Sequence, residues 1–170
     1  NELFDAKAPQ VHQYTGDARP WLQARRASYD AILVDAYRQP YIPFYLTTQE
    51  FFALVKDRLS KGGLVAINVG HPPGSDQLEK TLAATLRSVF GEGHVYRDVV
   101  DEFSTMLVAT TSQLDPGARL QAITHDDWQI PALAQQIGAD LRPALKGGPI
   151  YTDDKAPVEW LIDASFADLA

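Results

Sequence analysis

The fold is indicated most clearly by one stretch of sequence, Tyr29-Asp-Ala-Ile-Leu-Val-Asp35. Its apolar run Ile32–Val34 is unbroken, which is typical of a strand buried on both faces of a sheet. The run stops at a carboxylate, Asp35, and a loop rich in proline and aromatic residues follows it. Ligands of open α/β sheets bind just beyond the carboxyl ends of the strands. Asp35 is therefore a candidate for binding a small cationic or hydroxylated ligand, and capping of a turn is the alternative role for this acid.

Strands and helices are expected to alternate on both sides of this stretch. Before it, we expect a short strand at Val11–Thr15 and then a helix with Asp17 as its N-cap. After it, Thr47 and Glu50 match a capping box, and the glycine pair at 62–63 is expected to end the helix that they begin. Apolar patterns predict the remaining elements: strands at 64–69, 94–100 and 106–110, helices at 78–90 and 129–141, and a last amphipathic segment with Trp160, Leu161 and Phe166. This alternation indicates an α/β protein with a doubly wound parallel sheet.

The bulk composition is that of a globular protein. With 170 residues, 45% of them apolar, the chain is most simply a single domain, residues 1–170. It contains no cysteine, no run of apolar residues long enough for a membrane helix and no visible signal peptide, so we expect a cytoplasmic location. The net charge of −7 disfavours binding to nucleic acid. Because the sequence opens within what resembles a helix end or a loop, we expect a domain that is incomplete at its N-terminus.

Several motifs of well-known sites are absent from the sequence. It has no G-x-G-x-x-G fingerprint, no phosphate loop and no G-x-S-x-G elbow. The four histidines lack the spacing of metal ligands. The acidic pairs Asp126-Asp127 and Asp153-Asp154 are better explained as helix caps than as metal ligands, because both precede helical segments. No metal site is expected.

Five motifs, taken in order and spacing, resemble a known family over nearly the whole chain. They are Asp17-Ala-Arg19-x-x-Leu22, Tyr29-Asp-Ala-Ile-Leu-Val-Asp35, Ile42-Pro-x-x-Leu46-x-Thr-x-Glu50-Phe-Phe, Gly62-Gly63-Leu-Val-Ala-x-Asn68 and the tail Thr152-Asp-Asp-Lys-Ala-Pro-Val-Glu159. Together they resemble the C-terminal part of the catalytic domain in the spermidine synthase, or polyamine aminopropyltransferase, family. The tail is similar to that of spermidine synthase-like proteins, some of which are fused to membrane domains.

This resemblance implies a fold and a reaction. The implied fold is a class I methyltransferase-like (Rossmann-like) doubly wound sheet that lacks its first two strands and their glycine-rich loop. The implied reaction moves an aminopropyl group from decarboxylated S-adenosylmethionine, a co-substrate, to a polyamine, with no tightly bound cofactor. Asp35 matches the family's proton acceptor, and an amine must lose a proton before it attacks the carbon beside the sulfonium. Asp17 and Ala18 match the pair that holds the adenine, and Tyr37, Gln39 and Tyr41 are candidate pocket walls.

Two departures from the family pattern bear on activity. The family's loop carries a second aspartate that contacts the amine, whereas this chain reads Asp35-Ala-Tyr-Arg38-Gln-Pro40. An arginine there repels a diamine, which puts putrescine in doubt and leaves a different acceptor, a rearranged loop or a loss of activity open. The glycine-rich nucleotide loop has no counterpart, so we expect this chain alone to bind S-adenosyl ligands weakly or not at all.

Two other functions remain open at this point. One is an S-adenosylmethionine-dependent methyltransferase on the same fold. The other is a catalytically inactive interaction domain that uses the sheet edge or the Trp160 segment for self-association. A homodimer, and a membrane domain in the parent protein, are further expectations about its partners.

Overall fold

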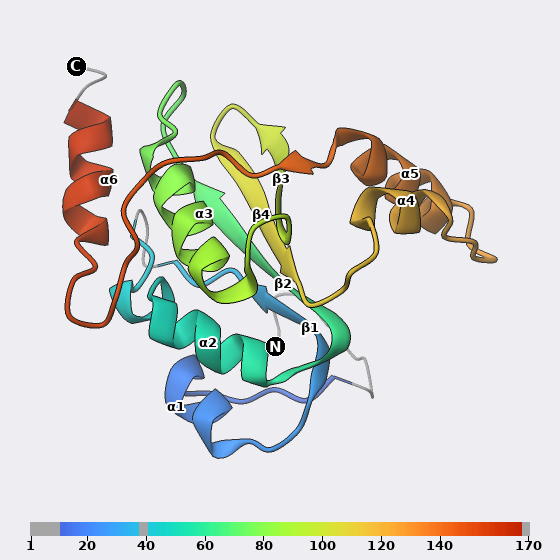
Figure 1. The fold of residues 1–170 in the computed structure, drawn as a ribbon, viewed down its shortest axis with the longest axis horizontal. Coiled ribbons are helices and arrows are strands. Elements are labelled where there is room, and N and C mark those ends of the chain that lie inside the picture. Colours follow the sequence, from blue (N-terminus) through green and yellow to red (C-terminus); the bar gives the residue numbers. More distant parts are fainter. Residues whose placement is uncertain (1–10, 38–40, 168–170) are drawn as a thin grey trace, which may run out of the picture.

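The computed structural model describes residues 11–37 and 41–167. A five-stranded sheet in the order β1-β2-β4-β3-β5 forms its centre, and α2 and α3 lie across one face of it (Figure 1). The strands are β1 (Tyr29–Val34), β2 (Leu59–Gly70), β3 (Val95–Asp101), β4 (Ser104–Thr110) and β5 (Arg142–Pro143). The helices are α1 (Ala18–Ala24), the 3-10 turn η1 (Phe44–Leu46), α2 (Gln49–Asp57), α3 (Gln77–Phe90), α4 (Pro116–Gln121), α5 (Gln129–Asp140) and α6 (Val158–Ala167). In the described ranges, none of these helices combines the length and the apolar character that a membrane crossing requires.

The sheet is mixed, so the expected parallel sheet is wrong beyond its first pair of strands. β1 and β2 are parallel, with Val34 opposite Ile67. β4 lies between β2 and β3 and is antiparallel to both. Only Glu102 and Phe103 connect β3 to β4, and so short a connection permits only antiparallel pairing. The chain thus returns to β2 through a hairpin and not through a second helical crossover.

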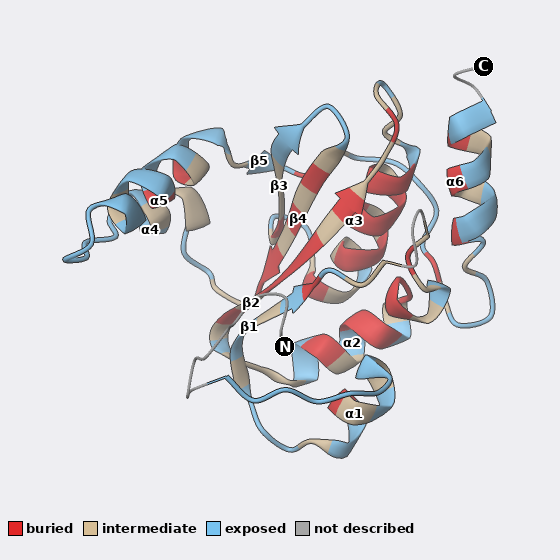
Figure 2. Cartoon of the chain, turned by 180° about the vertical axis from the view of Figure 1, so that it is seen from behind, coloured by how far each residue is buried: buried red, intermediate tan, exposed pale blue. Residues whose placement is uncertain are grey.

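In the part of the chain that the structure describes, β1 is an edge strand, and only one of its faces is covered. Val34 is buried against the core, but its neighbour Leu33 is 76% exposed. The expected burial of this strand on both faces is therefore wrong, because α2 and α3 cover a single face of the sheet (Figure 2). The expected strand at Val11–Thr15 does not form either: these residues are exposed and irregular. A strand needs a partner for its backbone hydrogen bonds, and the described residues supply none to this segment.

The start of α2 differs by one residue from the expected capping box. Thr48, not Thr47, is the N-cap, and its hydroxyl accepts from the N–H of Phe51 at 3.3 Å. The Thr47 hydroxyl donates instead to a carbonyl of η1. Glu50 does not close a capping box, because its carboxylate accepts from the N–H of Asp153 at 2.9 Å. Either of the two adjacent threonines could serve as the N-cap, and the tertiary contact with Asp153 favours Thr48.

The end of α2 also lies earlier than the glycine pair at 62–63 suggests. The helix ends at Asp57, and β2 begins at Leu59. The glycines fall inside β2, at an irregularity where the pairing with β1 passes from Leu59 directly to Leu64. Gly62 has a φ of +79° there, a conformation that favours glycine. The pair therefore forms a bulge in a strand and does not cap a helix.

The hydrophobic core lies between the sheet and the inner faces of α2 and α3, where Figure 2 shows the buried residues. Alternate residues of β2 and β4 point into it, as the two-residue period of strands requires. Side chains with less than 2% exposure include Phe52, Val55, Val65, Ile67, Leu82, Leu86 and Leu107.

A long segment after β5, residues 144–157, crosses the outside of α3 and leads to α6 (Figure 1); we call it the strap. The Arg87 side chain on α3 donates to the Leu145 carbonyl at 2.8 Å. Further along, the Thr85 hydroxyl accepts from the N–H of Tyr151 at 3.0 Å. The Tyr151 carbonyl then accepts from the N–H of Gln49 at 2.8 Å. The strap thereby joins α3 to the start of α2.

Candidate active site

Asp35 lies directly after β1, at the carboxyl end of the parallel strand pair. Its carboxylate accepts a hydrogen bond from the side-chain amide of Asn68 on β2, with Nδ2 and Oδ1 3.2 Å apart. The register explains this contact, because Val34 pairs with Ile67 and the next residue of each strand therefore lies at the same sheet edge. The Asp35 side chain is exposed, so its remaining oxygen lone pairs are accessible to a ligand.

A second hydrogen bond fixes the orientation of the Asn68 amide. Its Oδ1 accepts from the Ser104 hydroxyl at 2.7 Å. An ionised carboxylate only accepts hydrogen bonds, so the amide nitrogen must face Asp35 and the amide oxygen must face Ser104. Asn68 therefore holds the Asp35 carboxylate in one direction.

Tyr37 fastens the loop after β1 to the end of β2. Its hydroxyl donates to the Asn68 carbonyl at 2.7 Å and accepts from the N–H of Gly70 at 2.6 Å. Burial raises the pKa of the Tyr37 phenol; the hydrogen bond from Gly70 opposes this shift and the nearby Asp35 charge adds to it. The phenol therefore stays neutral at physiological pH, as a fixed hydrogen-bonding group and not as a proton acceptor.

These side chains open onto a pocket of about 660 Å³. Its lining combines polar residues from the ends of β1, β2 and β4 with apolar residues, two of which belong to α6. Its lining comprises Asp35, Tyr37, Asn68, Gly70, His71, Pro72, Phe103, Ser104, Ile162 and Phe166.

His71 lines the pocket with both ring nitrogens engaged. Nδ1 lies 3.1 Å from the Pro72 carbonyl, and Nε2 lies 3.1 Å from the Thr105 hydroxyl. A carbonyl can only accept, so in the neutral imidazole Nδ1 carries the proton and Nε2 accepts from Thr105. His71 and Pro72 therefore line the pocket, and the imidazole is held by its neighbours.

Of the other residues singled out from the sequence, Asp17, Ala18 and Tyr41 lie outside this pocket's lining. Asp17 is the N-cap of α1, as expected, and its Oδ1 accepts from the N–H of Arg19 at 3.0 Å. Ala18 is the first residue of that helix. The Tyr41 hydroxyl donates to the Asp163 carboxylate on α6 at 2.7 Å. Gln39 lies outside the described residues, as does Arg38. The structure thus brings Asp35 and Tyr37 together and leaves Asp17, Ala18 and Tyr41 apart from them.

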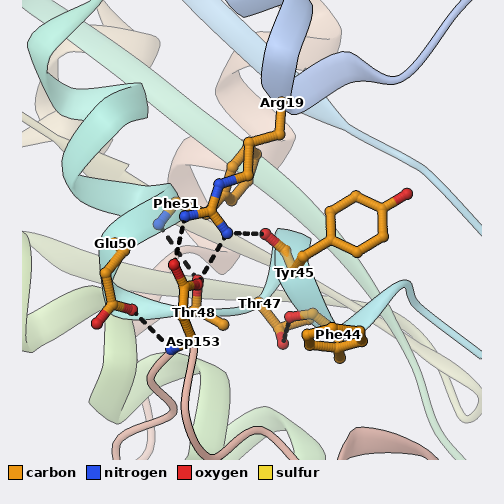
Figure 3. A network of polar contacts seen from close by, with 8 residues as sticks. All are labelled: Arg19, Phe44, Tyr45, Thr47, Thr48, Glu50, Phe51 and Asp153. Carbon is orange, nitrogen blue, oxygen red and sulfur yellow. Dashed lines mark hydrogen bonds and ion pairs between the residues drawn. The ribbon is translucent and has the colours of Figure 1, made fainter. Parts of the chain in front are cut away.

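A separate polar network joins α1, α2 and the strap (Figure 3). The Arg19 guanidinium donates to both carboxylate oxygens of Asp153, at 2.8 and 2.6 Å, and to the Tyr45 carbonyl at 3.0 Å. The buried Thr48 hydroxyl donates to Asp153 at 2.7 Å. The hydrogen bond from Arg19 is the largest cause that lowers the pKa of Asp153, and Thr48 contributes in the same direction.

This network corrects the interpretation of Asp153 as a helix cap. The carboxylate accepts from Arg19 and Thr48, which lie far from it in the sequence. In the other acidic pair, Asp127 accepts from the N–H of Gln129, the first residue of α5, although the N-cap position of that helix is Trp128. Within residues 11–37 and 41–167, no group of three or more histidine, aspartate or glutamate side chains is arranged to hold a metal ion.

A larger groove, of about 880 Å³, lies on the sheet face that α2 and α3 leave uncovered, beside α4 and α5. Its lining is mainly apolar and contains no residue that the sequence singled out as a site. Burial raises the pKa of Asp98 there, and the charge of Asp140 adds to the shift. The smaller pocket, which contains Asp35, is therefore the better candidate for chemistry.

Sequence reasoning gave no role to Asn68, Ser104, Ile162 or Phe166, all of which line the pocket. The rule that identified Asp35 also applies to Asn68, because Asn68 lies near the carboxyl end of a predicted strand as well. The two α6 residues carried no such signal, since the path of the strap decides where α6 lies.

Solved structures with a similar fold define the fold class of this chain. A probable spermidine synthase from Corynebacterium glutamicum matches 84% of this chain and 56% of its own, with a TM-score of 0.56 and 21% identity. Human methyltransferase-like protein 13 matches 79% of this chain and 61% of its own, with a TM-score of 0.50 and 18% identity. The chain has the class I methyltransferase-like α/β fold, as the sequence led us to expect.

Sequence similarity then gives the family. A probable polyamine aminopropyl transferase of Bifidobacterium longum is 32% identical over 99% of this chain and 43% of its own length. The chain belongs to the spermidine synthase, or polyamine aminopropyltransferase, family. It spans less than half the length of the curated relatives that it matches. No family model matches it.

Proposed function

We propose that this chain carries the amine-acceptor site of an aminopropyltransferase, with Asp35 as the proton acceptor and anchor of the amine. The observation that carries the proposal is the Asp35 carboxylate, which the Asn68 amide orients at the edge of a pocket of about 660 Å³. A carboxylate in this position attracts an ammonium group and aligns its nitrogen for attack. The similarity to polyamine aminopropyltransferases over nearly the whole chain supports the same reading.

The reaction that we propose has two linked events. The acceptor's ammonium loses a proton to Asp35, and the freed lone pair attacks the methylene carbon beside the donor's sulfonium. A carbon–nitrogen bond forms while the carbon–sulfur bond breaks, and the electron pair stays on sulfur, which leaves as neutral methylthioadenosine. The protonated carboxylate then releases its proton to solvent, while the new secondary amine leaves as an ammonium.

Asp17 and Ala18 are our candidates for binding the adenine of the donor. The Asp17 carboxylate uses one oxygen to cap α1, and its other lone pairs remain available for an exocyclic amine. Tyr37, Gln39 and Tyr41 are proposed as walls beside the acceptor. Within the described part of the chain, only Tyr37 of these three lines the pocket with Asp35.

A methyltransferase is the second candidate, because the fold is also similar to that of human methyltransferase-like protein 13, which was solved in complex with SAH. In that case the intact donor, not the decarboxylated one, would be consumed. The two functions therefore differ in their sulfonium substrate.

One assay separates the candidates. The full-length protein is incubated with decarboxylated or intact S-adenosylmethionine and a panel of amines, and the products are identified by mass spectrometry. We expect methylthioadenosine and an aminopropylated amine from the decarboxylated donor. Methylated products from the intact donor would favour a methyltransferase, and no consumption of either donor would favour an inactive interaction domain.

A further inference from the structure

Ser104 is the first residue of β4 and lines the same pocket as Asp35. In the antiparallel pairing of β2 with β4, Ser104 lies opposite Gly70, and Asn68 is two positions from Gly70 in the same strand. Asn68 and Ser104 are therefore diagonal neighbours on one face of the sheet, because residues two positions apart in a strand point the same way. This placement allows the Ser104 hydroxyl to donate to Asn68 Oδ1 at 2.7 Å.

The residues on both sides of Ser104 are bound to the end of β2. The Phe103 carbonyl accepts from the N–H of His71 at 2.8 Å. The hydroxyl of Thr105, a fully buried residue, lies 3.1 Å from His71 Nε2. Ser104 therefore lies between two anchored residues, so its hydroxyl has a rigid support.

The Asn68 amide and the Asp35 carboxylate both end in torsions that covalent geometry leaves broad. Hydrogen bonds therefore decide how each group is turned. Asn68 Nδ2 donates to Asp35 Oδ1 at 3.2 Å, which leaves the lone pairs of Oδ2 to accept a proton. The hydroxyl that donates to Asn68 Oδ1 also polarises the amide and strengthens the hydrogen bond from its nitrogen. Ser104 and Asp35 thus engage opposite ends of one amide.

We propose that Ser104 is a positioning residue for the proton acceptor and acts on Asp35 through Asn68. The inference rests on the proposed function and adds a residue of the hairpin between β3 and β4 to that site. Loss of the Ser104 hydroxyl frees the amide to rotate, so the carboxylate loses its fixed direction. Proton transfer depends on this direction, because a general base must lie within hydrogen-bond reach of the proton that it takes. The role requires no contact between the Ser104 hydroxyl and the substrate.

Removal and replacement of the hydroxyl give the first test. With the full-length protein, decarboxylated S-adenosylmethionine and the best amine acceptor, we expect Ser104→Ala to lower kcat by about tenfold. The KM for the donor should change by less than about twofold, because the proposed donor-binding residues Asp17 and Ala18 lie outside this lining. Ser104→Thr keeps a hydroxyl and should retain at least about half of the wild-type kcat.

Ser88→Ala is the matched control. The Ser88 hydroxyl donates to the Thr85 carbonyl within α3 at 2.7 Å, and Ser88 lies outside the pocket lining. Its kcat should stay within about twofold of the wild-type value. Circular dichroism and thermal unfolding verify that each variant folds. If Ser104→Ala does not fold, Ser104→Cys takes its place, since a thiol is only a weak donor.

A double-mutant cycle shows whether Ser104 acts through Asn68. Asn68→Ala removes the amide but keeps the main-chain carbonyl that accepts from Tyr37. If the two residues act as a unit, adding Ser104→Ala to Asn68→Ala should lower kcat by less than about a further twofold. Equal losses in both backgrounds, an undiminished kcat in Ser104→Ala, or no recovery in Ser104→Thr would overturn the inference and leave the proposed function standing. Absence of aminopropyl transfer by the wild type would instead contradict the proposed function, and this inference with it.

Discussion

Arg19 and Asp153 form a bidentate ion pair across 134 positions of sequence, with nitrogen–oxygen distances of 2.8 and 2.6 Å. Arg19 belongs to α1, directly after the proposed adenine-binding pair, and Asp153 belongs to the strap. The Asp153 N–H also donates to Glu50 of α2, so this one residue of the strap contacts both α1 and α2. The strap is therefore a structural part of the fold and not a loose tail.

Asp153→Asn should destabilise the protein. The variant removes the charge that the guanidinium and the Thr48 hydroxyl both engage. The Asp153 side chain is 43% exposed, so solvent screening limits the expected loss to about 1 kcal/mol in the free energy of unfolding. Urea denaturation at pH 7 measures it. Asp154→Asn removes the same charge from the exposed neighbouring residue and should change the value by less than about 0.5 kcal/mol; equal losses in the two variants would contradict this account.

The same ion pair predicts a pH dependence. The pKa of Asp153 is lowered in the folded protein, so the unfolded chain binds the proton more readily and the pair stabilises the fold at higher pH. Its contribution is complete above the unfolded pKa of about 3.9 and is lost as the pH falls through the lower folded value. We expect the stability difference between the wild type and Asp153→Asn to be constant from pH 7 to about 5 and to shrink below about 4. A difference that grows on acidification would refute the assigned direction.

Two neighbouring glycines of the strap test how closely it lies on α3. A Cβ at Gly148 would come within 2.7 Å of the backbone of Lys80 and Thr81, whereas a Cβ at Gly147 would meet no atom within 4 Å. Both glycines have positive φ, so substitution by alanine would cause similar backbone strain at either site, roughly 1–2 kcal/mol. Gly148→Ala should cost about 1–3 kcal/mol more than Gly147→Ala, because it also forces the strap away from α3. Thermal unfolding of the two variants gives the comparison, and equal costs would show that the strap can move freely.

Tyr37→Phe should loosen the edge of the sheet beside Asp35. It leaves the Gly70 N–H and the Asn68 carbonyl without their shared partner, which costs about 1–3 kcal/mol in the free energy of unfolding. Because Asn68 orients Asp35, kcat/KM should fall as well. Tyr96→Phe is the control, since its hydroxyl makes one exposed hydrogen bond, to the Gly93 carbonyl. A loss in Tyr37→Phe no larger than in the control would contradict the role of the hydroxyl.

Local signals in the sequence predicted most elements of the fold. Asp17 caps α1, and the apolar runs of β2 and β4 form strands where expected, because short-range periodicity and capping decide these features. The place of β4 between β2 and β3 was not predictable in this way, since it depends on which strand edges meet after the chain has turned back. The expected strand at Val11–Thr15 failed because a strand requires a neighbour, not only suitable residues.

The features of the candidate site also fall into two groups, those that the sequence predicts and those that only the structure reveals. Asp35 could be identified because a carboxylate follows a strand, and that rule needs no tertiary information. The pairing of Asp153 with Arg19, and the presence of Phe166 in the same pocket lining as Asp35, both depend on the path of the strap across α3. Contacts between residues so far apart in the sequence leave no periodic pattern, so only the structure reveals them.

The proton-acceptor role of Asp35 is tested most directly by comparing Asp35→Asn with Asp30→Asn in the full-length protein. Both carboxylates belong to the same short stretch, but Asp30 lies at the start of β1, where it accepts from the Ser60 hydroxyl and does not line the Asp35 pocket. The measurement is kcat/KM for methylthioadenosine release from decarboxylated S-adenosylmethionine with the best amine acceptor. We predict a loss of about 100-fold or more for Asp35→Asn, with unchanged thermal stability, and a change below about threefold for Asp30→Asn. Wild-type turnover in Asp35→Asn would contradict the account.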